Sequence, residues 1–126
     1  MTAPDVSPVA GLRVLVVEDE YMIAEHISIL LEDLGCDVAG PVATIDDALS
    51  ILKSGKLDGA LLDANLNGVG TGPIAAALNE ASVPFIVATG YGSRDLGDNA
   101  LNLAPRINKP FGKIELRATL LSALAR

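Results

Sequence analysis

Short apolar runs of strand character alternate with segments of helical periodicity along most of this 126-residue chain. The first run, residues 12–17, is continuous and rich in valine, which is typical of a strand buried on both faces. From Tyr21 to Leu34, apolar residues recur at helical spacing. Such an alternation, joined by short connections, predicts a parallel sheet that right-handed crossover helices cover on both faces.

The remaining elements continue the same order. Pro41 lacks an N–H group, so the strand that contains it is expected at an edge of the sheet. Three glycines interrupt the first half of residues 90–104, so the fourth helix is expected to be short, frayed or partly disordered. We therefore predict an α/β fold, a doubly wound sheet of five parallel strands. Its later strands are expected over 36–43, 58–63, 83–88 and 106–108, and its other full helices over 44–55, 73–79 and 113–125.

Domain organisation follows from length. Residues 1–10 carry two prolines and no periodicity, and are expected to form a flexible leader. Residues 11–126 have the length of one domain, which needs neither a metal ion nor a disulfide to fold. The fold uses nearly the whole chain, so no separate effector domain is expected if the chain is the whole gene product.

Charge and cysteine content exclude several classes. Sixteen acidic against nine basic residues give a net charge of −7, which argues against nucleic-acid binding and a polybasic membrane anchor. The start of the chain lacks the pattern of a signal peptide, and no apolar stretch approaches the roughly 20 residues of a membrane helix. The single cysteine, Cys36, is expected to be a small buried residue, and it fits a cytoplasmic location. His26 is expected at or near the surface.

Polar residues follow the predicted strands at their carboxyl ends. Ligands bind at this edge of an open parallel sheet, so these side chains are expected to converge there. Glu18 and Asp19 follow the first strand, Asp63 ends the third, Thr89 follows the fourth and Lys109 follows the fifth.

This set suits phosphoryl transfer. Three carboxylates repel one another unless a cation intervenes, and Mg²⁺ prefers oxygen ligands. One carboxylate could attack phosphorus and form an aspartyl phosphate, while the metal and Lys109 offset the charge on the phosphoryl oxygens. The hydroxyl of Thr89 could donate a hydrogen bond to the product.

The motifs VLVVEDE, LLDANLNG, VATG and NKPF, in this order, resemble those of receiver domains of two-component response regulators. The resemblance covers about residues 11–126 and implies a flavodoxin-like strand order of 2-1-3-4-5. It also implies a cis peptide between Lys109 and Pro110. By this resemblance Asp63 is the phosphoacceptor, Thr89 the switch hydroxyl and Lys109 the phosphate-pairing base, and Mg²⁺ is held by Glu18, Asp19, Asp63 and the backbone carbonyl of Asn65.

Two positions depart from the family pattern. Arg106 stands where most receivers have a switch aromatic, and Asn67 stands where they have a proline. Residues 85–92 instead resemble the FATGUY group of single-domain receivers, which also has a degraded fourth helix. That resemblance implies Tyr91 as the mobile aromatic and a histidine kinase of the HWE or a related type as partner.

The function implied is phosphorylation-dependent signalling through protein contacts, or service as a phosphate sink or relay, with at most slow self-dephosphorylation. Phosphorylation is expected to move residues 90–104 most. One alternative is a pseudo-receiver that only binds partners. Another is an aspartyl-nucleophile phosphatase, which would need a second aspartate where Asn65 stands. The plainer interpretations are helix N-terminal acids for residues 18–20, a turn aspartate for Asp63, a loop anchor for Tyr91 and a solvated or ion-paired side chain for Arg106.

Overall fold

A five-stranded parallel sheet forms the centre of the molecule in the computed structural model, which describes residues 9–90 and 95–124. The strand order β2-β1-β3-β6-β7 confirms the predicted 2-1-3-4-5 order, because β4 and β5 form a separate hairpin. Every pair in the large sheet is parallel. Its strands are β1 (Arg13–Val17), β2 (Asp37–Val42), β3 (Gly59–Asp63), β6 (Phe85–Thr89) and β7 (Arg106–Asn108).

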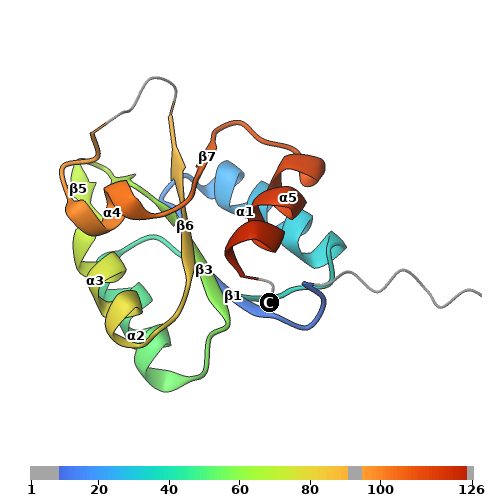
Figure 1. The fold of residues 1–126 in the computed structure, drawn as a ribbon, viewed down its shortest axis with the longest axis horizontal. Helices are drawn as coiled ribbons and strands as arrows, with labels where there is room; N and C mark the ends of the chain where they lie inside the picture. The colour runs from blue at the N-terminus through green and yellow to red at the C-terminus, as the bar shows by residue number, and fades with distance from the viewer. Residues whose placement is uncertain (1–8, 91–94, 125–126) are drawn as a thin grey trace, which may run out of the picture.

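Helices cover both faces of this sheet (Figure 1). On one face lie α1 (Tyr21–Asp33) and α5 (Lys113–Ala123), and on the other α2 (Ile45–Ser54), α3 (Gly72–Glu80) and α4 (Asn99–Leu103). In β1, Val14 and Val16 pack under α1 and α5, whereas Leu15 and Val17 pack under the other helices. This alternation explains why the strand reads as one continuous apolar run.

The edge position predicted for the second strand is confirmed, since β2 pairs with β1 alone. The pairing register shifts between Leu15 and Val17, opposite the Gly40–Pro41 peptide, which is cis. Gly40 has a φ of 97°, and a Cβ there would lie 2.9 Å from the backbone nitrogen of Val42. The irregular turn in β2 therefore requires glycine.

The packed part of the chain begins earlier than the composition suggests. Val9, inside the predicted leader, is fully buried among the residues under α1 and α5. The Cys36 thiol lies 3.4 Å from the carbonyl oxygen of Val9, and the prediction of a buried Cys36 is confirmed. The leader remains a prediction for residues 1–8, which lie outside the described part of the chain.

A small hairpin follows β3. Its strands are β4 (Asn65–Leu66) and β5 (Val69–Gly70), which pair antiparallel. The two residues between them, Asn67 and Gly68, have φ angles of 52° and 88°, as a type I′ turn requires. A proline could not replace Asn67 in this turn, because its ring holds φ near about −65°. The departure from the family pattern at this position therefore has a backbone reason.

The fourth helix is short, as predicted. It has five residues, and the Asp98 side chain accepts hydrogen bonds from the backbone N–H groups of Ala100 and Leu101 at its start. Leu101 is fully buried and anchors α4 against the core under α2 and α3. Tyr91, the predicted mobile aromatic, lies outside the described residues. Over 9–90 and 95–124, no helix has the length and apolar character needed to cross a membrane.

Candidate functional site

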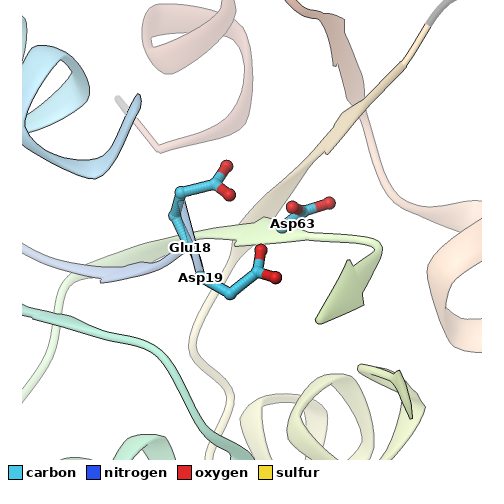
Figure 2. Close-up of side chains that lie close together, drawn as sticks. All are labelled: Glu18, Asp19 and Asp63. Atoms are coloured by element: carbon cyan, nitrogen blue, oxygen red, sulfur yellow. The ribbon is translucent and has the colours of Figure 1, made fainter. Parts of the chain in front are cut away.

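The carboxyl ends of β1 and β3 bring three acidic side chains together (Figure 2). Glu18 and Asp19 directly follow β1, and Asp63 is the last residue of β3, with which β1 pairs in register. Each of the three offers one carboxylate oxygen, and these oxygens all lie within 4.8 Å of one another. The convergence predicted from the strand ends is therefore present for the acids.

Lys109 bridges two of these carboxylates. Its Nζ donates hydrogen bonds of 3.0 Å to Glu18 Oε1 and 3.0 Å to Asp63 Oδ2. Its backbone N–H donates to the carbonyl of Thr89, which continues the pairing of β7 with β6. The Lys109–Pro110 peptide is cis, as the resemblance implied. Burial lowers the pKa of Lys109, but the hydrogen bonds and charges of Asp63 and Glu18 outweigh it, so the net pKa is raised.

Glu18 is the most deeply buried of the acids, with 3% of its surface exposed. Burial, and to a smaller extent the charge of Asp63, raise its pKa to about 7 against the lowering effects of the Glu20 N–H and Lys109. When all are ionised, three carboxylates and one ammonium leave two uncompensated negative charges. A hard divalent cation fits this donor set, because its charge matches the two negative charges and it prefers oxygen ligands.

The raised pKa of Glu18 gives a pH dependence of stability. Between the usual value of 4.5 and about 7, the folded state holds its proton while the unfolded state releases it. Stability in metal-free buffer is therefore expected to fall as pH rises through this window, by on the order of 1–3 kcal/mol from this group. Urea unfolding at a series of pH values measures the slope.

Glu18→Gln is the reference protein, because it removes this titration and leaves the other acids in place. The wild-type chain is expected to lose more stability than Glu18→Gln between pH 4.5 and about 7. Identical slopes in the two proteins would contradict the assigned cause.

A buried threonine that the sequence did not indicate supports the loop after β3. The hydroxyl of Thr71 is fully buried and donates to the backbone carbonyl of Asp63 at 2.8 Å. Thr71 precedes α3, where its side chain would ordinarily cap the helix, yet it makes no cap hydrogen bond. Only the tertiary contact reveals its role, which is to hold the end of β3 in place.

The peptide of Asn65 lies next to Asp63. Its N–H donates to Asp63 Oδ1 at 3.2 Å, and its side-chain Oδ1 accepts from the Gly68 N–H at 2.6 Å. These bonds fix Asn65 between the end of β3 and the hairpin turn. That its backbone carbonyl is a metal ligand stays a prediction.

Thr89 reaches the same edge of the sheet, but its hydroxyl is bonded elsewhere. It is 2% exposed and donates to Asn108 Oδ1 at 3.2 Å. Thr89 and Asn108 are partners in the β6–β7 register. Nothing in the sequence marked Asn108 beyond its place in the NKPF motif.

Arg106 connects β7 to α4. It is half-buried, and its Nη2 donates to Asn102 Oδ1 at 2.9 Å. The same oxygen accepts from the Leu96 N–H, and Asn102 Nδ2 donates to Asp95. The Asn102 and Gly97 hydrogen bonds, with a smaller contribution from the charge of Arg106, lower the pKa of Asp95. The residue at the expected aromatic position thus holds the segment around α4. His26 is exposed on α1, as predicted.

Known proteins are similar to this chain in sequence and fold. The chain is 32% identical over 115 residues to the phyllosphere-induced regulator PhyR of Methylorubrum extorquens, covering 89% of this chain and 43% of PhyR. The solution structure of SdrG from Sphingomonas melonis Fr1 superposes with a TM-score of 0.78 at 36% identity, covering 92% of this chain and 97% of SdrG. The receiver domain of the sensor histidine kinase PA1611 from Pseudomonas aeruginosa has magnesium in its active-site cleft. It superposes with a TM-score of 0.78 at 25% identity, covering 91% of this chain and 98% of that domain.

The chain spans about half the length of the first curated relatives it matches, 43% of PhyR and 49% of the regulator YvrH of Bacillus subtilis. The family model described as the response regulator receiver domain matches residues 14–121, which contain all the site residues described above. The fold, the acidic cluster and the bridging lysine agree with that match. The chain therefore belongs to the family of response regulator receiver domains.

Proposed function

We propose that this domain accepts a phosphoryl group on Asp63 from a histidine kinase in a Mg²⁺-dependent reaction in the cytoplasm. The observation that carries the proposal is the placement of Lys109 Nζ 3.0 Å from Asp63 Oδ2, beside a cluster of three carboxylates. The phosphorylated domain then signals through protein contacts or acts as a phosphate sink or relay. Apart from slow self-dephosphorylation, it is not an enzyme.

The transfer is a displacement at phosphorus. An oxygen of Asp63 attacks, and the bond between phosphorus and the donor's histidine nitrogen breaks. Lys109, already beside Asp63, offsets charge on the phosphoryl oxygens, and Thr89 donates its hydroxyl to one of them. Mg²⁺ supplies further charge neutralisation when bound. The residues that would hold it are Glu18, Asp19, Asp63 and, through its carbonyl, Asn65.

Two finer assignments rest on similarity. The motif over residues 85–92 supports membership of the FATGUY group. That group membership supports an HWE-type or related kinase as the donor. Tyr91 remains the proposed mobile aromatic.

A small-molecule phosphodonor tests the chemistry without a kinase. Incubation with acetyl phosphate and Mg²⁺ is expected to add a single phosphoryl group, read as intact mass. A chelator is expected to prevent the addition, because the carboxylate cluster then repels the donor. Labelling that is absent, or equal with and without the chelator, would contradict the proposal and favour a pseudo-receiver.

A groove beside Lys109 supports a docking site for the donor protein. A groove of about 370 Å³ between α1 and the residues after β7 contains Lys109 itself, so a protein seated there is next to Asp63. Met22 lines this groove and is 76% exposed, so it contributes little to the core. We assign the groove to the kinase domain that carries the phosphohistidine. Its walls are Met22, Ile23, His26, Ile27, Lys109, Pro110 and Phe111.

Met22→Glu separates docking from chemistry. It is expected to slow transfer from a phosphorylated kinase by about tenfold, because a charge replaces an apolar contact, and to leave labelling by acetyl phosphate unchanged. Leu103→Glu is the matched control, since Leu103 is 81% exposed and lines a different groove, together with Pro84 just before β6. Equal rates of kinase transfer to Met22→Glu and to the control would exclude this groove.

A further inference from the structure

The hydroxyl of Thr89 already has a partner in this structure. It donates to Asn108 Oδ1 at 3.2 Å, and the two residues are neighbours across β6 and β7. The side chain of Thr89 is 2% exposed, so water does not replace that partner readily. Within the described residues, no buried side-chain nitrogen or oxygen lacks a hydrogen bond.

One hydroxyl hydrogen cannot serve two acceptors equally. A threonine hydroxyl has a single hydrogen to donate. The proposed function gives that hydrogen to a phosphoryl oxygen on Asp63, whereas this structure gives it to Asn108. The bond to Asn108 therefore belongs to the unphosphorylated state alone, and forming the phosphorylated state requires breaking it.

We propose that Asn108 is a positioning residue that holds the Thr89 hydroxyl in the unphosphorylated state and so limits how readily the phosphorylated state forms. The inference rests on the proposed function of Thr89. An interaction made in only one of two states shifts the equilibrium between them by its own free energy. Removing it therefore favours the phosphorylated state.

Asn108 can be replaced without disturbing the core or the backbone pairing. Its side chain is exposed, so alanine there opens no cavity and leaves no buried polar group at residue 108 itself. The backbone bond from the Lys109 N–H to the Thr89 carbonyl, 2.8 Å, does not involve the Asn108 side chain. The substitution therefore removes the hydrogen-bond acceptor of the Thr89 hydroxyl and leaves the backbone pairing in place.

The first test measures binding of beryllofluoride, a phosphoryl mimic, in saturating Mg²⁺. Asn108→Ala is expected to bind it about two- to tenfold more tightly than the wild-type chain, the range of one neutral hydrogen bond. In the Thr89→Val background, which keeps the side-chain shape and removes the hydroxyl, Asn108→Ala is expected to change nothing. Asn79→Ala, at another exposed asparagine, is the control and is expected to bind as wild type.

A second measurement needs no metal. Asn108→Ala is expected to lower the folding equilibrium constant by about the same two- to tenfold factor in chelated buffer, and only when Thr89 is present. Structural damage would weaken beryllofluoride binding, so tighter binding together with lower stability is specific to this inference.

Three results would overturn it. They are unchanged or weaker beryllofluoride binding by Asn108→Ala, tighter binding that persists with Thr89→Val, and a stability loss independent of Thr89. Failure of the wild-type chain to bind beryllofluoride is a separate outcome. It would overturn the proposed function and with it the role of Asn108 in phosphorylation.

Discussion

Asp63→Asn is expected to abolish phosphorylation by every donor while making the metal-free fold more stable. The amide has no nucleophilic carboxylate oxygen, so labelling falls to zero rather than to a lower rate. The same change removes one of three negative charges whose oxygens lie within 4.8 Å of one another. Near pH 8, where Glu18 is ionised and remains a partner of Lys109, losing that repulsion is expected to stabilise the fold by about 1–2 kcal/mol in chelated buffer.

This prediction is specific because the same substitution abolishes labelling and raises stability. Labelling is read as intact mass after acetyl phosphate or a phosphorylated kinase, and stability by urea unfolding. Asp46→Asn is the control, since Asp46 is an exposed acid in the first turn of α2, and it is expected to be labelled normally without gaining stability. Normal labelling of Asp63→Asn would place the phosphoacceptor elsewhere, and a loss of stability would mean that Asp63 has a structural role.

Lys109→Met is expected to have the opposite effect on stability. Lys109 holds two carboxylates at 3.0 Å, and its side chain is only 19% exposed. Removing one partner of such a group leaves charge buried without compensation, which is expected to cost about 2–4 kcal/mol in chelated buffer near pH 8. Part of the loss is expected to return with Mg²⁺, because a ligand that binds only the folded state stabilises it.

The same variant tests the role of Lys109 in transfer. Loss of the ammonium beside Asp63 is expected to slow labelling by acetyl phosphate by about 100-fold, as for the loss of one preorganised charge-stabilising donor. Lys113→Met is the matched control. Lys113 makes an exposed ion pair of 4.0 Å with Asp33, which contributes little. Equal stability and equal labelling of the two variants would rule out the bridging role.

Strand ends explain why the site could be read from the sequence. Glu18 follows and Asp63 ends a buried strand, Lys109 directly follows β7, and parallel topology alone brings those ends to one edge. The continuous apolar run of β1 and the proline in β2 were likewise sufficient to place a central and an edge strand. These features depend on local pattern and topology, which the sequence carries directly.

Other features depend on partners that no local pattern specifies. Val9 follows a proline in a segment without periodicity, and only its packing under α1 makes it part of the core. The Thr71 hydroxyl binds Asp63 rather than capping α3, and the Thr89 hydroxyl binds Asn108. The hairpin turn is different, since Asn67-Gly68 is a pair of residues that local pattern does associate with a hairpin turn.

The most direct measurement is the location of the phosphoryl group in the wild-type chain. After reaction with acetyl phosphate and Mg²⁺, borohydride reduction converts an aspartyl phosphate to homoserine, and peptide mass spectrometry identifies the converted residue. Conversion of Asp63 alone, and only when Mg²⁺ is present, is the expected result. An unmodified Asp63, or a phosphoryl group on His26 or another carboxylate, would contradict it.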